Sequence, residues 1–221
     1  MPLMIKTVTY RDADYGEILE LQRSTFGKMV ELRRKGLDVG DEVIMLVEHK
    51  PVYTLGRHAE RANIINPDYL RLRGAQVYEI ERGGDVTFHG PGQLVAYVLI
   101  DLQRHQLGVK DFVNCLEEAV IRTIGEYGVV GERIEGATGV WIGKGTPRER
   151  KICAIGIKCS RFITMHGLAL NVDTDLEWFS AINPCGFTDK SVTSLKQELP
   201  EAPTWAQVAP RLSHHLQLLL K

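Results

Sequence analysis

The chain has 221 residues, of which 44% are hydrophobic and 25% are charged, and its formal net charge is −1. These values are ordinary for a globular protein and predict a single domain over residues 1–221 with a sizeable core. A charge so close to zero indicates no general attraction to nucleic acid, and no apolar run approaches the roughly 20 residues of a membrane span. The N-terminus lacks the apolar core of a signal peptide, so the predicted location is the cytoplasm.

The first predicted element is a helix over residues 15–35. Asp14 can cap its start, with Glu17 as the reciprocal partner in a capping box, and Gly36 can end it. The residues at helical spacing that we expect on its buried side are Ile18, Leu21, Thr25, Met29 and Leu32.

Short apolar runs rich in β-branched residues predict strands along the chain. The predicted strands cover residues 43–47, 52–55, 74–80, 94–102 and 165–172. Residues 139–143 and 151–158 flank a polar link that contains glycine and proline, and this pattern predicts a hairpin.

Two further helices are predicted. Asp111 can cap a helix that runs to about Tyr127, and Thr204 with Gln207 forms a capping-box pattern that opens a C-terminal helix. Pro210 should kink or restart that helix. Helices interspersed with hairpin-like strand pairs predict an α/β (α+β) fold, in which helices cover a mixed, largely antiparallel sheet.

Residues 82–93, Arg-Gly-Gly-Asp-Val-Thr-Phe-His-Gly-Pro-Gly-Gln, form a dense polar and glycine-rich segment. Its glycines permit tight turns and let a ligand approach the backbone closely. Arg82, Thr87, His89 and Gln93 add donors that suit a carbonyl or a phosphate group. The pattern is neither a Walker A motif nor G-x-G-x-x-G, and a glycine-rich turn with incidental polar residues is the alternative to a ligand cradle. We expect His89 to contact the ligand rather than to act as the main base.

The cysteines at positions 115, 153, 159 and 185 include no C-x-x-C pair, so neither a zinc knuckle nor a thioredoxin-type motif is indicated. Cys115 falls in a predicted helix. Cys153 and Cys159 share one face of a predicted strand, which is typical of core thiols. Cys185 stands in the sequence Asn-Pro-Cys-Gly, which predicts a loop, and loops carry reactive groups more often than cores do.

A cysteine acts as a nucleophile through its thiolate, and at an ordinary pKa of about 8.5 only a few per cent is ionised at pH 7. A nearby ammonium group raises that fraction. Lys151, at the start of the predicted strand 151–158, is a candidate partner for Cys185. A solvated lysine beside Arg148 and Arg150 is the alternative, and the residue pattern leaves both open.

Ordered motifs in the chain resemble those of the lipoyl(octanoyl) transferase family. Residues 82–93 match Arg-Gly-Gly-x-x-Thr-aromatic-His-x-x-Gly-Gln. Residues 151–156 match Lys-Ile-Ala-Ala-Ile-Gly apart from Cys153, and residues 164–171 match Thr-x-His-Gly-x-Ala-Leu-Asn.

The resemblance extends to both sides of these motifs. Pro-Cys-Gly at 184–186 is followed by Val-Thr-Ser-Leu at 192–195, as in the family, and residues 48–56 resemble its N-terminal signature. The similar region covers about residues 15–215. It implies the catalytic fold of biotin and lipoate protein ligases, which is related to the cores of class II aminoacyl-tRNA synthetases.

The resemblance also implies an activity and its partners. An acyltransferase of this family moves an octanoyl group from octanoyl-acyl carrier protein to a lysine of a lipoyl domain, in 2-oxoacid dehydrogenases and in the glycine cleavage H protein. No metal and no other cofactor is implied, because a thioester is already activated. Cys185 would hold the acyl group as a thioester, and Lys151 would favour the thiolate and handle protons. The acyl-site residues that the resemblance implies are Arg82, Gly83, Gly84, Asp85, Val86, Thr87, Phe88, His89, Ala154, Ile155, Gly156, Gly167, Leu168 and Ala169.

Three alternatives remain at this point. An ATP-dependent lipoate or biotin ligase of the same fold needs no cysteine nucleophile. An octanoyl amidotransferase would take the octanoyl group from an octanoylated protein. A non-catalytic module that binds acyl groups or carrier proteins would hold inert thiols. Cys153, two residues from Lys151, is a second thiol to test as the nucleophile.

Overall fold

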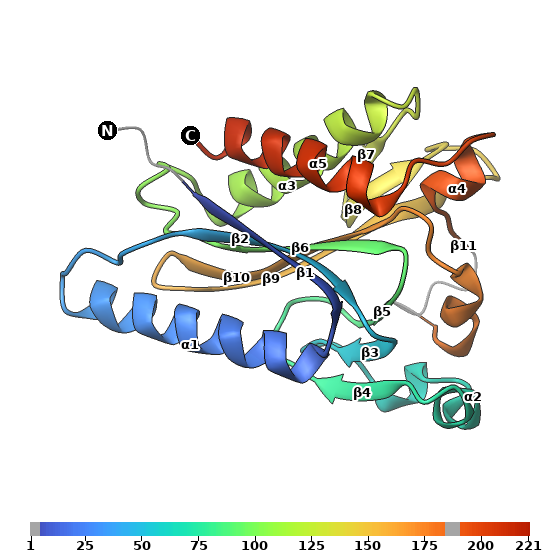
Figure 1. Cartoon of the computed structure of the whole chain (residues 1–221), viewed down its shortest axis with the longest axis horizontal. Coiled ribbons are helices and arrows are strands. Elements are labelled where there is room, and N and C mark those ends of the chain that lie inside the picture. Colours follow the sequence, from blue (N-terminus) through green and yellow to red (C-terminus); the bar gives the residue numbers. More distant parts are fainter. Residues whose placement is uncertain (1–4, 184–190) are drawn as a thin grey trace.

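The computed structural model describes residues 5–183 and 191–221, and its centre is a mixed sheet (Figure 1). The strands of this main sheet run in the order β1 (Lys6–Ala13), β2 (Val43–His49), β6 (Gln93–Leu99), β10 (Ile163–Asn171), β9 (Arg150–Ser160), β8 (Ala137–Ile142) and β7 (Glu132–Ile134). Strand β1 is parallel to β2, and the other neighbours in this order are antiparallel. Strand β11 (Ser191–Val192) pairs in parallel with the start of β9. The prediction of a mixed, largely antiparallel sheet is confirmed.

A second, smaller sheet lies beside one end of the main sheet (Figure 1). Its strands run in the order β4 (Gln76–Glu79), β3 (Val52–Leu55) and β5 (Val86–His89). The elements near it are α2 (Pro67–Leu72) and the 3-10 segments η1 (Arg61–Asn63) and η2 (Leu176–Ala181). Aromatic residues fill its core: the Phe88 ring stacks on the Trp178 ring at 5.0 Å between centroids, and Tyr53 packs beside them.

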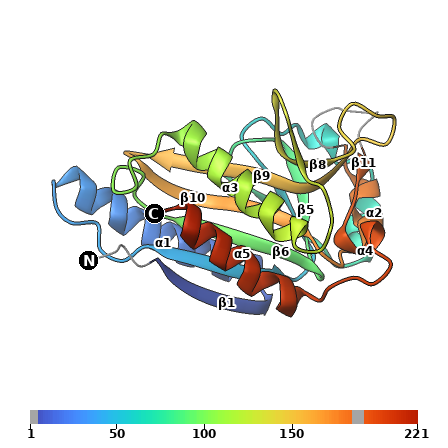
Figure 2. The ribbon, with the colours of Figure 1, turned by 90° about the horizontal axis from the view of Figure 1, so that it is seen from above.

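Helices cover both faces of the main sheet (Figures 1 and 2). Helix α1 (Tyr15–Arg34) lies on one face, while α3 (Val109–Gly125) and α5 (Trp205–Leu219), which follows the short α4 (Leu195–Glu198), lie on the other. Two buried apolar clusters result, one between the sheet and the α3–α5 pair and one between the sheet and α1. The prediction that helices cover the sheet is confirmed.

The buried side of α1 differs from the predicted one. Ile18 and Met29 are buried as predicted, but Leu21 is 44% exposed. The buried face instead includes the polar Gln22, whose side-chain oxygen accepts a hydrogen bond from the His166 N–H at 3.2 Å. Hydrophobic spacing cannot find this face, because a polar side chain occupies its middle.

The other two helices also differ in detail. The Asp111 carboxylate does not cap α3 from outside; it lies within the first turn and accepts a hydrogen bond from the Gly108 N–H. The capping box of Thr204 and Gln207 opens α5 as predicted. The helix does not restart at Pro210, because α5 continues through this residue, which lies on the exposed side.

Candidate active site

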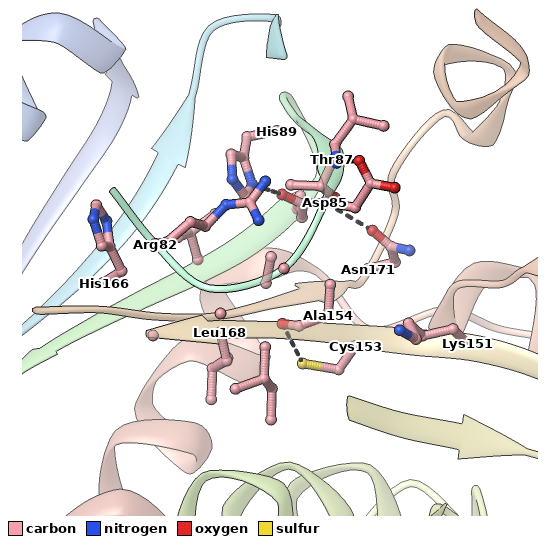
Figure 3. Close-up of a pocket in the computed structure, with 18 of the residues that line it drawn as sticks. Arg82, Asp85, Thr87, His89, Lys151, Cys153, Ala154, His166, Leu168 and Asn171 are labelled. Atoms are coloured by element: carbon pink, nitrogen blue, oxygen red, sulfur yellow. Dashed lines mark hydrogen bonds between the residues drawn. The ribbon is translucent and has the colours of Figure 1, made fainter. Parts of the chain in front are cut away.

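A cavity of about 110 Å³ lies where residues 82–85 cross over strands β9 and β10 (Figure 3). Its walls come from the main sheet, from this glycine-rich loop, from β5 and from the start of α1. The predicted site residues that line it are Arg82, Gly84, Asp85, Val86, Thr87, His89, Lys151, Ala154, Ile155, Gly156, Gly167, Leu168 and Ala169. Segments far apart in the chain therefore meet around one space.

The sheet wall of the cavity joins two of the sequence motifs. Strands β9 and β10 are antiparallel, and their register pairs Ala154 with Ala169, Ile155 with Leu168, and Gly156 with Gly167. Two predicted triplets thus lie directly opposite each other. Their small side chains on the cavity side leave room for a ligand against the sheet.

The glycine-rich loop is held over this wall by Arg82. The buried guanidinium group donates to the Thr54 carbonyl at 2.8 Å, to the Thr54 hydroxyl at 2.9 Å and to the Gly83 carbonyl at 3.0 Å. The Gly83 N–H donates to the Ile157 carbonyl of β9 at 2.9 Å. Arg82 therefore fixes the loop rather than offering a free cation to a ligand.

Two glycines allow this loop to lie so close to its neighbours. A Cβ atom on Gly156 would meet the Gly83 carbonyl oxygen at 2.7 Å, and one on Gly56 would meet the Gly84 carbonyl oxygen at 2.4 Å. Both distances are shorter than real Cβ contacts allow. Glycine at these positions is a requirement of the site's shape.

Asp85 lies at the other end of the loop and joins it to the small sheet. Its carboxylate accepts hydrogen bonds from the Asn63 amide at 2.8 and 3.0 Å and from the Val86 N–H at 2.6 Å. The Asn63 carbonyl in turn accepts from the Asn183 N–H at 2.8 Å. This chain of contacts fixes the backbone just before residue 184.

His89 belongs to a buried relay that crosses from the small sheet to the main sheet. Its Nδ1 lies 2.8 Å from the Gln93 side-chain oxygen, and the Gln93 amide donates to the Asn171 side-chain oxygen at 2.9 Å. The Asn171 amide donates to the Thr193 carbonyl at 2.9 Å. Burial lowers the pKa of His89 to about 3, so the ring is neutral near pH 7. A neutral, fixed imidazole suits hydrogen bonding to a ligand.

Lys151 lies at one end of the cavity, near the start of β9 (Figure 3). Its ammonium nitrogen is 4.6 Å from the centre of the Trp141 ring, a distance that suits a cation–π contact. Val192 of β11 pairs with Lys151, and the Thr193 N–H donates to the Lys151 carbonyl at 2.9 Å. The side chain is half-buried, while neighbouring Arg150 pairs with Glu198. Lys151 is therefore not a fully solvated strand-end lysine.

The described thiols are buried or half-buried. Cys153 is fully buried, and burial raises the pKa of its thiol to about 12. Burial also raises the pKa of the half-buried Cys159 and Cys115. Cys153 and Cys159 contact the same apolar cluster, as predicted from their strand positions. Cys185, the predicted nucleophile, lies outside the described residues.

Two predicted site residues do not line the cavity. Phe88 points into the core of the small sheet, because alternate residues of β5 face opposite sides. Gly83 contributes its backbone to the contact with β9 instead. Other lining residues, such as Tyr15, Tyr97 and Phe179, come from separate elements and stand in no motif, so the sequence did not predict them.

Among the described residues, no group of three or more His, Cys, Asp or Glu side chains is placed to hold a metal ion. In the same part of the chain, no helix combines the length and apolar character that crossing a membrane requires.

The chain is similar to known proteins in both sequence and structure. The family model of the lipoyl protein ligase A/B catalytic domain matches residues 14–217. An octanoyltransferase of Bacteroides fragilis is 48% identical over 215 residues, which cover 96% of this chain and 97% of the relative.

Solved structures with the same fold are more distant in sequence. The bi-partite lipoate protein ligase of Thermoplasma acidophilum has a TM-score of 0.70 at 15% identity, covering 98% of this chain and 84% of that one. The biotin protein ligase of Aquifex aeolicus has a TM-score of 0.53 at 11% identity, covering 98% and 69%. At these identities the likeness concerns the fold, and it agrees with the fold that the motifs predicted.

Proposed function

Because the chain belongs to the lipoyl protein ligase A/B catalytic domain family and is similar to octanoyltransferases along nearly its whole length, we propose that it is the octanoyltransferase of lipoate biosynthesis. The donor is octanoyl-acyl carrier protein, and the acceptor is a lysine of a lipoyl domain. The observation that carries this proposal is the cavity lined by small and apolar residues that ends at Lys151. Such a space suits a fatty acyl chain whose carbonyl lies near the lysine.

The reaction has two half-reactions. The Cys185 thiolate attacks the donor thioester, a new carbon–sulfur bond forms, and the bond to the carrier's sulfur breaks. The carrier's thiolate leaves and takes up a proton. The amine of the target lysine, after losing a proton, then attacks the acyl-enzyme; a carbon–nitrogen bond forms and the Cys185 thiolate is released. Lys151, whose ammonium group gave its proton to the leaving carrier thiolate, is neutral at this stage and accepts the proton from the amine.

The other thiols support Cys185 as the nucleophile by elimination. A pKa of about 12 makes Cys153 almost entirely a neutral thiol near pH 7, and burial acts in the same direction on Cys159 and Cys115. Cys153 lines the cavity, but its side chain is fully buried in the apolar cluster behind the sheet, so it is a poor nucleophile.

The chain on both sides of Cys185 supports its place near Lys151. Asn183, two residues earlier, is held by the Asn63 carbonyl, and two residues span at most about 7 Å. Val192, seven residues later, is paired with Lys151 itself. Both anchors lie beside the cavity, because Asn63 also binds the lining residue Asp85 and Val192 is a lining residue.

The loop and the sheet divide the remaining roles. The Gly83 N–H cannot stabilise the oxyanion, because it already donates to Ile157. Arg82 and Asp85 hold the loop over the acyl chain, and His89 contacts the substrate as a neutral imidazole. A cytoplasmic location belongs to the same proposal, since a free catalytic thiol persists in a reducing compartment. So does a single catalytic domain over residues 1–221.

The test is acyl transfer followed by mass spectrometry. Incubation with octanoyl-carrier protein, without ATP, should add one octanoyl group to the peptide that contains Cys185, and a lipoyl domain should remove it. Cys185→Ala should abolish both steps, whereas the matched Cys153→Ala should keep them. Labelling on Cys153, or transfer that needs ATP and free acid, would contradict the proposal and would favour a ligase in the second case.

A second experiment tests Lys151. Modification of Cys185 by a thiol reagent at pH 6.5 should slow at least tenfold in Lys151→Met, because the ammonium group no longer favours the thiolate. An unchanged rate would remove Lys151 from this role. An octanoyl amidotransferase is distinguished by its donor: it would prefer an octanoylated protein to the carrier-protein thioester.

A further inference from the structure

His166 is a buried polar residue for which the chemistry above has no role. It is 2% exposed and lines the cavity, yet neither ring nitrogen has a hydrogen-bond partner within residues 5–183 and 191–221. A buried polar group without a partner costs free energy, so a position of this kind requires an explanation. Its backbone is also unusual, with φ at +64° in the middle of the pairing between β9 and β10.

The surroundings of His166 are also polar. Gln22 of α1 accepts from the His166 N–H, and the Tyr97 ring packs edge-on to the imidazole at 6.4 Å between centroids. Tyr97 and Tyr15 line the same cavity, and the Tyr97 hydroxyl lies 2.8 Å from His49 Nε2. The Gln22 amide nitrogen has no hydrogen bond of standard geometry among the described residues, although the amide is close enough to influence the pKa of Tyr97.

This polar group lies at the end of the cavity opposite Lys151. His166 pairs with Ile157 of β9, six residues along the strand from Lys151, and Figure 3 shows the two side chains at opposite ends of the site. Six residues of strand correspond to about 20 Å between the two Cα atoms. The Lys151 amine points along the strand toward the cavity, so the lysine side chain takes up part of that span (Figure 3). If the acyl carbonyl reacts near Lys151, the far end of the chain points toward His166.

The imidazole is neutral, since burial lowers the pKa of His166 to about 3. It therefore offers one donor and one acceptor. The terminal torsion of a histidine is broad, so the ring can turn to meet a water molecule in the cavity. An apolar chain that fills this end prevents that hydration and offers no hydrogen bond in return.

We propose that His166 sets the acyl chain length of the enzyme, by ending an apolar cavity in polar groups that a longer chain cannot satisfy. It is a specificity-determining residue, supported by Gln22, and the inference rests on the proposed function. The limit arises from polarity rather than from size, and this point gives the test its two variants.

Polarity and size predict opposite outcomes at this position. His166→Phe is larger and apolar, so it should accept longer chains only if polarity sets the limit. His166→Asn is smaller and polar, and asparagine tolerates positive φ well, so it should accept longer chains only if size sets the limit. Thr123→Val is the matched control, because it removes a buried hydroxyl from α3 away from the cavity.

The measurement is kcat/KM for octanoyl, decanoyl and dodecanoyl thioesters. We expect the ratio of decanoyl to octanoyl to rise at least about fivefold in His166→Phe, the factor that about 1 kcal/mol represents. The ratio should stay unchanged in His166→Asn and Thr123→Val. An unchanged ratio in a folded His166→Phe protein, or a rise in His166→Asn, would overturn the proposal. If His166→Phe fails to fold, His166→Asn still tests whether size sets the limit: an unchanged ratio excludes size, and a raised ratio overturns the proposal.

Thermal stabilisation by free fatty acids of the same lengths gives a second readout that needs no transfer step. If the preferred fatty acid length changes in the His166 variants but the unmodified protein does not transfer octanoyl, the proposed function alone is contradicted. Normal transfer with no change in selection would contradict this inference alone.

Discussion

The two walls of the cavity are built in different ways. The sheet wall is continuous backbone pairing between β9 and β10, with Gly156 opposite Gly167 and Ala154 opposite Ala169. The loop wall, residues 82–85, reaches the main sheet at Gly83 and depends on the side chains of Arg82 and Asp85 for its shape. The sheet wall should therefore be damaged by added atoms, and the loop wall by removed ones.

The largest expected effect is the removal of Arg82. In Arg82→Leu the Thr54 and Gly83 carbonyls lose a charged donor while they remain inside the protein, so the free energy of unfolding should fall by about 3 kcal/mol. Octanoyl transfer should fall with it, because the loop wall loses its support. Guanidinium denaturation and initial transfer rates measure the two effects.

Arg122→Leu is the control for loss of an arginine. Arg122 pairs with Glu118 on the surface of α3 and is 47% exposed, so this change should alter the free energy of unfolding by less than about 0.5 kcal/mol. Equal losses in the two variants would show that the Arg82 contacts do not stabilise the loop.

The next effect tests the sheet wall by adding one carbon. Gly156→Ala places a Cβ 2.7 Å from the Gly83 carbonyl oxygen, so the loop must move, at a cost of about 2 kcal/mol. Gly27→Ala, in the middle of α1 with open space around it, should instead stabilise the protein by about 0.5–1 kcal/mol. Thermal unfolding compares the two; a stable, active Gly156→Ala protein would mean that the loop is free to lift.

The residues of the two walls could be predicted from the sequence, but the contacts between them could not. The motifs predicted most residues of both walls, because glycine and polar patterns are local signals. The sequence could not predict that residues 154–156 pair with residues 167–169, because strand register depends on contacts between strands. Strand β1 was missed because its burial does not alternate strongly, and Gln22 was missed because a buried polar residue resembles a surface one in a pattern. His166 stands in the motif at 164–171 but was not assigned to the site.

A smaller effect tests the relay that joins the two walls. Burial lowers the pKa of His89 to about 3, below the value of about 6.5 in an unfolded chain, so between these pH values the unfolded state binds a proton that the folded state does not. The free energy of unfolding therefore falls as pH falls from about 6.5. In His89→Gln the slope should decrease by up to about 1.4 kcal/mol per pH unit.

Denaturation at pH 7, 6 and 5 measures this slope. His214→Gln, at an exposed position on α5, is the matched control. The slope should match that of the unmodified protein in the control and should be lower in His89→Gln. An identical slope in both variants would mean that His89 takes up its proton without unfolding.

The smallest expected change in stability concerns the far anchor of the loop wall. Asn63→Ala removes both hydrogen bonds to the Asp85 carboxylate but leaves the backbone bond from Asn183, so unfolding should become easier by only about 1 kcal/mol. Transfer should fall more than stability does, at least tenfold, because Asp85 lines the cavity and loses its orientation. Asn114→Ala, on the exposed side of α3, should change neither quantity. A loss of activity no larger than the loss of stability explains would make Asn63 a purely structural contact, and Arg82 would remain as the side chain that supports the loop wall.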